Sequence, residues 1–420
     1  MPPESRTVVF GAFDRHNLGD LLFVNVVAAL LPERDLVFAG IADRDLSAWG
    51  GYRVEALARL ADDPRATDVI VAGGEVLTCE AWEAAVMLLP DNEANAAAAH
   101  FGREAERRTE WAQRILGTAR RAPYAPAKSM FSCPGRLIYN AVGGVEFATS
   151  EAALRDEVKA ALRSADFISV RDRVTQAALA AEGIAAVLVP DCGALVAELF
   201  GNRIRERGLQ GEPAAVCAAF PHGYLAVQFS ADCEDDATLG TLARELDAAA
   251  QATGCGIVFF RAGTAPWHDA LDPYRRAAKR MQSHVHLFES AHIQDICALI
   301  AGSRGFAGTS LHGRIVAAAF ALPRVSFVPP DVVTGGKPCK QDAYVATWEM
   351  AEQPGVVPLD SLAAGLAQAL RADSLQLAAH SVRLAGLCRE GSAQWIASLN
   401  VKIAQVQKAP GDGVLGAKRT

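Results

Sequence analysis

The sequence has no long hydrophobic run. Its 420 residues contain no stretch of about 20 uncharged apolar residues, the length that a helix needs to cross a bilayer. The polar start, MPPESRT, leads at once into VVFGAF, whereas a secretory signal would place a longer apolar segment behind a basic start. We therefore expect no transmembrane segment and a cytoplasmic location.

An excess of positive charge is also missing. The 41 Lys and Arg residues face 48 Asp and Glu residues, which gives a net charge of −7. A nucleic-acid partner is therefore not expected. A small anion can still be bound in a local basic pocket, because the local potential rather than the total charge attracts it.

Signals for metals and nucleotide cofactors are weak. The nine cysteines are scattered and form no CxxC pair, which excludes a zinc ribbon and gives no disulfide framework. HVHLFESAH contains three histidines (His284, His286 and His292), but it lacks a carboxylate or further ligand at a recognised spacing. The glycine pair in VIVAGGEVL does not have the spacing of the dinucleotide fingerprint. We predict no metal and no cofactor.

What is present is an alternation of short Val-, Ile- and Phe-rich runs with longer stretches of helical period. Such alternation is typical of a parallel sheet covered by helices on both faces. The strands are expected at 7–10, 36–41, 68–71, 136–141, 167–170 and 186–189, then at 224–229, 256–260, 285–288, 305–307 and 324–327. Helices are expected between them, at 21–31, 54–61, 151–163, 174–182, 237–253, 273–282, 293–301, 311–321, 361–370 and 374–400.

The length exceeds the size at which one hydrophobic core stops growing, so two domains are predicted. The fold class is α/β, with two Rossmann-like parallel-sheet domains facing a cleft in a GT-B-like arrangement. We place the first domain at 1–204, the second at 205–385, and a C-terminal helix with a flexible tail at 386–420. A polar linker is expected at 201–212. Residues 78–135 read as an insertion, and its part at 92–130 is either a solvated helix pair or part of an acceptor surface or an interface.

In such sheets ligands bind at the carboxyl ends of strands. The segment GAFDRHNLGDLLF follows the first strand, and there Asn17 and Asp20 can cap a helix whose exposed amino end holds an anion. Gly19 allows close backbone approach. For Asp20, capping and function are equally open. The pair Gly73–Gly74 follows another strand, where glycines also serve tight packing.

Two further strand ends carry charged residues. The strand in FISVRDRV delivers Arg171 and Asp172, and an arginine there can clamp a carboxylate or phosphate in bidentate fashion. Asp172 either orients Arg171 or caps the next helix. Arg261 is a second candidate clamp, and Asp191 after Pro190 has no assigned role.

The most informative segment is GTSLHGRIVAAAFALP. Thr309 or Ser310 can cap a helix that carries Leu311, His312 and Gly313 in its first turn. His312 then sits at a helix amino end, which favours bound anions. Arg314 is expected at the surface.

In order along the chain, NLGD, AGGE, NAVGG, SVRD, PD and TSLHGRIVAAAFALP make this sequence resemble the polysaccharide pyruvyl transferase family. The resemblance implies a GT-B-like fold and an enzyme that moves a pyruvyl group from phosphoenolpyruvate to a sugar, forming a pyruvate ketal in a glycan or polysaccharide. It implies that His312 acts as acid or stabilises phosphate, that Arg171 clamps the donor, and that Asn17 and Asp20 serve the acceptor. Where many members have Arg–Leu–His, this chain has Ser310, so Arg171, Arg261 or Lys337 is needed to hold the donor.

Two alternatives stay open. The first is a glycosyltransferase of the same architecture that uses a nucleotide sugar, with Glu289 holding the ribose. The second is a glycan-binding relative that has lost the chemistry, for which Ser310 in place of arginine is the main support.

Overall fold

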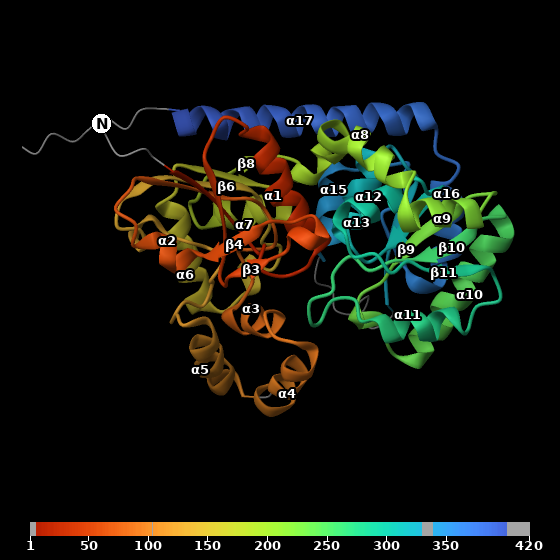
Figure 1. Ribbon diagram of the computed structural model, residues 1–420, viewed down its shortest axis with the longest axis horizontal. Helices are drawn as coiled ribbons and strands as arrows, with labels where there is room; N and C mark the ends of the chain where they lie inside the picture. The colour runs from red at the N-terminus through yellow and green to blue at the C-terminus, as the bar shows by residue number, and fades with distance from the viewer. Residues whose placement is uncertain (1–5, 103, 330–338, 401–420) are drawn as a thin grey trace, which may run out of the picture.

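The computed structural model describes residues 6–102, 104–329 and 339–400 of the chain. Within these ranges two α/β domains lie side by side, and one long helix runs along both of them (Figure 1). Each domain is built on a sheet whose neighbouring strands are parallel, apart from one short antiparallel pair at an edge.

The first sheet has the strand order β3-β4-β2-β1-β5-β6-β7-β8. Its strands are β1 (Arg6–Phe10), β2 (Leu36–Gly40), β3 (Arg44–Asp45), β4 (Arg53–Ala56), β5 (Thr67–Val71), β6 (Pro134–Val142), β7 (Phe167–Val170) and β8 (Val187–Leu188). The second sheet has the order β11-β10-β9-β12-β13-β14. It consists of β9 (Tyr224–Gln228), β10 (Gly256–Phe259), β11 (Val285–Leu287), β12 (Gly305–Gly308), β13 (Arg324–Val328) and β14 (Val356–Pro358).

The main helices of the first domain are α1 (Leu18–Leu30), α2 (Leu57–Ala61), α6 (Ala152–Arg163) and α7 (Arg173–Ala181). The second domain has α10 (Asp236–Thr253), α11 (Leu271–Ala278), α12 (Ile293–Ala301), α13 (Leu311–Ala319), α15 (Lys340–Trp348) and α16 (Leu362–Ala369). Because helices cover both faces of each sheet, central strands such as β1 and β9 are buried along their whole length.

Every predicted strand is present, with ends that differ by two residues or fewer. Two other predictions are wrong. Residues 54–61 start as strand β4, because Val54 is buried between exposed Arg53 and Glu55, and become helical only in α2. The predicted linker at 201–212 lies instead in α8 (Val196–Gly208) and α9 (Gly211–Ala219), and α8 buries Val196 and Ile204 in the core of the second domain.

The helix pair predicted within 92–130 is present as α4 (Asp91–Phe101) and α5 (Ala105–Leu116), and the insertion also contains α3 (Ala81–Met87). They form a separate lobe below the first domain in Figure 1. Trp82 and Trp111 pack against each other inside this lobe, with ring centroids 5.0 Å apart. The lobe therefore has a small aromatic core of its own.

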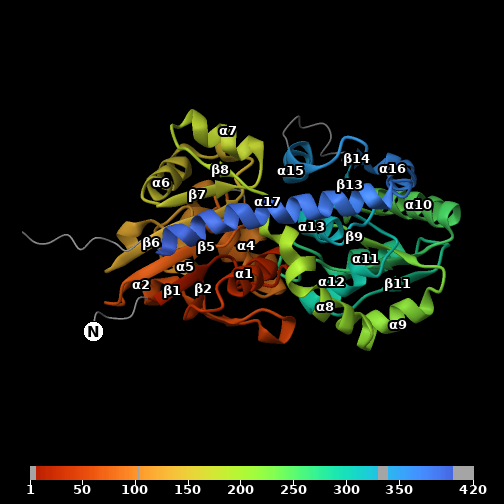
Figure 2. The same ribbon diagram turned by 90° about the horizontal axis from the view of Figure 1, so that it is seen from above.

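Helix α17 (Ser374–Asn400) has the predicted bounds and crosses back from the second domain to the first, as Figure 2 shows from above. Trp395 near its end is fully buried against the first domain, while Ser381 donates a hydrogen bond to the Ala319 carbonyl in the second. The predicted boundary at residue 386 therefore falls inside this helix, and the predicted flexible tail lies outside the described residues. No helix in the described ranges is long and apolar enough to cross a membrane.

Strand order fixes where a ligand site belongs. β1 lies between β2 and β5, and β9 lies between β10 and β12. The chain therefore adds strands on one side of each of these central strands first and then on the other side. Such a switch point opens a crevice at the carboxyl ends of the strands. The loops after β1 and β5 in the first sheet and after β9 and β12 in the second, together with the neighbouring loop after β10, are therefore the expected site.

Candidate active site

Loops from these strand ends meet between the two domains. The loop after β1 and the loop after β10 join through a backbone bridge between Asn17 and Gly263. The Leu18 N–H also donates to the Ala262 carbonyl at 2.7 Å. The start of α1 therefore contacts the second domain directly.

Asn17 caps helix α1, as predicted. Its Oδ1 accepts hydrogen bonds from the backbone N–H groups of Gly19 at 2.9 Å and Asp20 at 3.3 Å. Asp20 is not the cap but lies in the first turn, where its carboxylate is buried. Burial raises the pKa of Asp20, although Arg15 and His312 nearby act to lower it.

His312 lies at the amino end of α13, also as predicted. Ser310 caps this helix by accepting from the Gly313 N–H at 3.1 Å. The imidazole is 15% exposed, and its ring meets the edge of the Phe23 ring from α1 at 5.0 Å. Nε2 lies 3.6 Å from Oδ2 of Asp191 and has no hydrogen-bond partner among the described residues.

Arg171 is 2% exposed and bound at both ends. Nη2 lies 2.5 Å from Oε2 of Glu75, and Nη1 lies 3.1 Å from Oδ2 of Asp191. Burial alone would raise the pKa of Asp191, but His312 and Arg171 hold it below the ordinary value. This pairing corrects the expected role of Arg171: its guanidinium fixes Asp191 beside His312 and has no free fork for a substrate anion.

The glycine pairs make room for this ion-pair network. Gly73 and Gly74 have φ of +113° and +90°, a region that favours glycine, and they turn the chain so that Glu75 points back toward Arg171. A methyl group at Gly143 would lie 2.3 Å from Oε2 of Glu75. The motifs AGGE and NAVGG therefore both leave room for the salt bridge between Glu75 and Arg171.

Arg15 is a site residue that the sequence analysis missed. Its side chain is 11% exposed, with Nε 3.9 Å from Oδ2 of Asp20 and the guanidinium carbon 5.2 Å from the centre of the Tyr124 ring. Burial acts to lower the pKa of Arg15, but Tyr124, Cys79 and Asp20 raise it above its ordinary value, so the group is charged. Nε and Nη1 are buried and donate no hydrogen bond to the described residues.

Tyr124 comes from the Pro-rich loop of the insertion. Its hydroxyl donates to Oδ1 of Asp14 at 2.9 Å, and Oδ2 of Asp14 accepts from the Ile41 and Ala42 N–H groups. Burial raises the pKa of both Asp14 and Tyr124. The segment 78–135 therefore supplies one wall of the Arg15 site.

His268 lies in the loop between β10 and α11 of the second domain. Burial, followed by the charges of Arg15, Lys340 and His16, lowers the pKa of His268 to about 3. Its Nε2 is buried without a hydrogen-bond partner in the described part of the chain. Asp269 holds this loop by accepting hydrogen bonds from the backbone N–H groups of Ala262 and Gly263. Burial raises the pKa of Asp269 to about 7.

The remaining cations lie around this group. Arg261 is half-buried after β10, near Asp269, and acts to lower the pKa of that carboxyl. Lys340 is exposed at the start of α15, where its charge acts on both Asp20 and His268. Lys337 lies outside the described residues.

Several predicted roles are corrected by packing. Both oxygens of Asp172 accept from Thr175, so it caps α7 and is not free to bind a ligand. Leu311 is buried in the core that the two domains share. Gly313 is needed because a methyl group there would lie 2.6 Å from the Phe306 ring. Arg314, expected at the surface, is fully buried beside Glu349.

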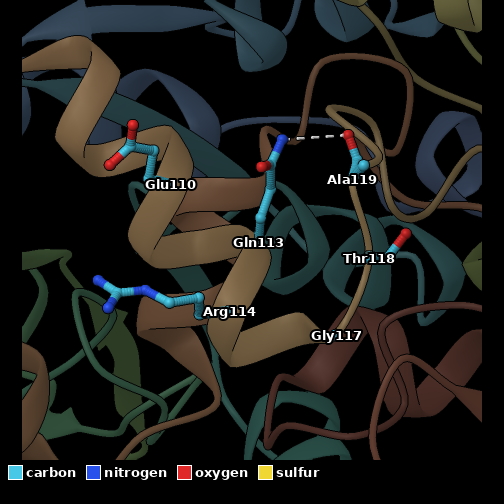
Figure 3. Close-up of a pocket in the computed structure, with 6 residues that line it drawn as sticks. All are labelled: Glu110, Gln113, Arg114, Gly117, Thr118 and Ala119. Carbon is cyan, nitrogen blue, oxygen red and sulfur yellow. Dashed lines mark hydrogen bonds between the residues drawn. The ribbon is translucent and has the colours of Figure 1, made fainter.

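No group of three or more His, Cys, Asp or Glu side chains within the described ranges is arranged to hold a metal ion. Of the three histidines at 284–292, His286 contacts Glu212 at 3.3 Å and His292 caps α12. A hollow at the end of α5 lies in the insertion lobe, away from the site. Figure 3 shows Gln113 reaching across it to the Ala119 carbonyl, and none of the predicted site residues lines it.

Arg15, His268, Tyr124 and Glu75 were not predicted as site residues. Arg15 lies in GAFDRHNLGDLLF and Glu75 in VIVAGGEVL, two segments that the sequence analysis names as candidate sites. Their position directly after a strand is the signal that could have identified them as site residues. Tyr124 and His268 carry no local signal, because their place depends on loops brought together by the fold.

Two Rossmann-like domains with ligand loops at facing strand ends define a GT-B-like α/β protein. Solved structures agree with this class at the level of fold. The chain is similar to the UDP-GlcNAc 2-epimerase of Neisseria meningitidis (TM-score 0.50, 10% identity, covering 94% of this chain and 99% of that one). It is also similar to a putative UDP-N-acetylglucosamine 2-epimerase of Listeria monocytogenes (TM-score 0.50, 12% identity, covering 99% and 100%).

Sequence comparison gives the family. The profile of the polysaccharide pyruvyl transferases matches residues 17–330, which include NLGD, the Arg171 network and His312. The chain belongs to the polysaccharide pyruvyl transferase family. A comparison with curated proteins found no match.

Proposed function

We propose that this chain transfers the pyruvyl group of phosphoenolpyruvate to two hydroxyls of a sugar in a glycan or polysaccharide, forming a pyruvate ketal. The observation that carries the proposal is a set of buried nitrogen atoms at the domain junction that donate no hydrogen bond to the described residues: Nε and Nη1 of Arg15 and Nε2 of His268. Buried N–H donors are normally paired, and leaving one unpaired costs about 1–3 kcal/mol. A small anion would satisfy them.

Phosphoenolpyruvate is such an anion, with a carboxylate and a phosphate. Arg15 is charged and buried, and its Nε and Nη1 donate no hydrogen bond to the described residues although Asp20 lies 3.9 Å from Nε, so Arg15 is suited to clamp one of these groups. It approaches from the first domain and so supplies the positive charge that Ser310 does not. Arg261 and Lys340 add positive charge nearby.

The chemistry needs an acid, and we assign that role to His312. Protonation of the methylene carbon makes the adjacent carbon electrophilic, and a first sugar hydroxyl attacks it and gives up its proton. A second hydroxyl then displaces phosphate, loses its proton and closes the ketal. Imidazole suits proton transfer near neutral pH. Asp191, held by Arg171, orients His312 at 3.6 Å.

The acceptor side is assigned to Asp20 and Asn17 at the start of α1. Asp20 lies between Arg15 and His312, and its raised pKa makes it a candidate to take a proton from a sugar hydroxyl. Asn17 uses its Oδ1 for the cap, so only its amide N–H group is available to a ligand.

Donor choice tests the proposal. The purified chain is incubated with phosphoenolpyruvate or with UDP-GlcNAc, each with a panel of glycan acceptors, and released phosphate, released UDP and acceptor mass are measured. Phosphate release together with a ketal on the acceptor is expected, and His312→Ala should abolish both. UDP release with no reaction of phosphoenolpyruvate would favour a nucleotide-sugar glycosyltransferase. No turnover and no binding of phosphoenolpyruvate would favour a non-catalytic relative.

A further inference from the structure

Trp267 has an unusual backbone and an exposed ring. It lies in the loop between β10 and α11, with φ of +63° and a relative exposure of 39%. A bulky residue rarely adopts a positive φ, and such residues gather at functional sites because the surrounding structure must hold them there. Trp267 therefore calls for an explanation other than core packing.

Its neighbours place Trp267 at the edge of the active site. The next residue, His268, packs beside Gly263, whose backbone forms the bridge to Asn17 at the domain junction. On its other side, the Trp267 ring contacts Trp82 of the insertion, with centroids 6.0 Å apart. Burial raises the pKa of Glu83, which stands beside Trp82, and the charge of Arg15 acts against this rise. Trp267 thus lies where the second domain and the insertion meet beside the donor site.

The insertion supports the Trp267 ring through a row of contacting aromatic side chains. Trp82 is 8% exposed and meets Trp111 edge to face, and Trp111 stacks on Phe101. This chain of rings anchors Trp82 in the core of the lobe. One part of the Trp267 indole is therefore supported by a fixed ring, while the rest faces solvent.

We propose that Trp267 is the platform on which a pyranose ring of the acceptor stacks, supported by Trp82 of the insertion. The C–H groups on one face of a pyranose form an apolar surface that matches an indole, while its hydroxyls stay free to react. The inference rests on the proposed function, since it presumes that a sugar approaches the donor held by Arg15. It gives the insertion a role in acceptor recognition.

The test separates stacking from donor binding and from folding. Methyl β-D-glucopyranoside, methyl β-D-galactopyranoside and methyl β-D-mannopyranoside are titrated in saturation-transfer NMR, and phosphoenolpyruvate is titrated by calorimetry. The proteins are wild type, Trp267→Gly, Trp267→Phe and the control Ile115→Ala, which removes an exposed apolar side chain of α5 in the same lobe. Glycine suits the positive φ at position 267, so Trp267→Gly removes the ring without straining the backbone.

We expect Trp267→Gly to weaken glycoside binding about tenfold, the scale of one aromatic contact. Trp267→Phe should keep part of the binding, Ile115→Ala all of it, and phosphoenolpyruvate affinity should not change. Equal glycoside binding by wild type and Trp267→Gly would overturn the inference. It would also be overturned if wild type gave no saturation-transfer signal with any of the three glycosides. A drop in Tm of more than about 4 °C in Trp267→Gly would also overturn it, because the ring would then be structural. Failure of wild type to bind phosphoenolpyruvate would instead contradict the proposed function.

Discussion

Gly19 and His312 are in contact across the two domains only because residue 19 has no side chain. A methyl group at position 19 would lie 2.0 Å from Nδ1 of His312. On its other side the imidazole is confined by the Phe23 ring and by Asp191. The motifs NLGD and SLHG, nearly 300 residues apart in the chain, therefore form one contact that orients the proposed acid.

Gly19→Ala should lower kcat by about 100-fold, because the new methyl group displaces the imidazole and misplacement by about 1 Å costs that much. The rate is measured as phosphate release from phosphoenolpyruvate in the presence of acceptor. Gly240→Ala is the control, since its added methyl group meets nothing closer than the end of Arg244 at 3.8 Å, and it should keep full activity. An active Gly19→Ala enzyme would remove the proposed constraint on His312.

His312→Gln should lower kcat by about 10²- to 10⁴-fold, the contribution of a well-placed acid. Glutamine keeps a polar side chain but cannot deliver a proton near neutral pH. Calorimetry should show phosphoenolpyruvate still binding, because Arg15 provides the main charge. If turnover is unchanged while the protein is folded, His312 is not the acid.

Arg171→Met should destabilise the fold by about 3–5 kcal/mol, because it leaves the buried Asp191 carboxylate and the partly buried Glu75 carboxylate without their cation. Urea unfolding measures the loss. Arg59→Met is the control: Arg59 pairs with Asp43 on the surface, where such pairs contribute about 0–1 kcal/mol. If Arg171→Met loses no more free energy of unfolding than the control, the ion pairs of Arg171 with Glu75 and Asp191 do not stabilise the site.

Glu349 predicts how stability depends on pH. Burial would raise its pKa, but Arg324 and Arg314 hold the pKa well below the ordinary value of 4.5. A carboxyl whose folded-state pKa is depressed adds stability that is fully present above its unfolded pKa and is lost as pH falls toward the folded value. Glu349→Gln should therefore unfold more easily in urea than wild type at pH 7, by about 3–5 kcal/mol. The difference should narrow below about pH 4.5; a difference that grows on acidification would contradict this assignment.

Most strands of the two sheets could be predicted because their runs are apolar on both faces and bounded by turn residues. The short strands β3, β4 and β14 were missed because most of their residues are exposed or half-buried. The polar composition of 201–212 predicts a linker, and only the packing of this stretch on the second domain explains why Ile204 is buried.

The candidate site was predicted in outline. His312, Asn17 and Gly19 follow from caps and strand ends, which are local signals. The partner of Arg171 could not be foreseen, because Glu75 is 96 residues away along the chain. Arg15 was missed because one arginine in a loop has no pattern, and it becomes notable only once Tyr124 and Asp20 surround it.

The central claim is that Arg15 binds phosphoenolpyruvate. The affinity of the Arg15→Met variant for phosphoenolpyruvate tests this claim most directly. Calorimetry compares this variant with wild type and with Arg371→Met, which removes an exposed arginine of the second domain. Hydrogen bonds to charged groups are worth about 1.5–3 kcal/mol, so we predict a dissociation constant at least about tenfold higher for Arg15→Met and unchanged for Arg371→Met. Equal affinity in wild type and a folded Arg15→Met protein would contradict the account.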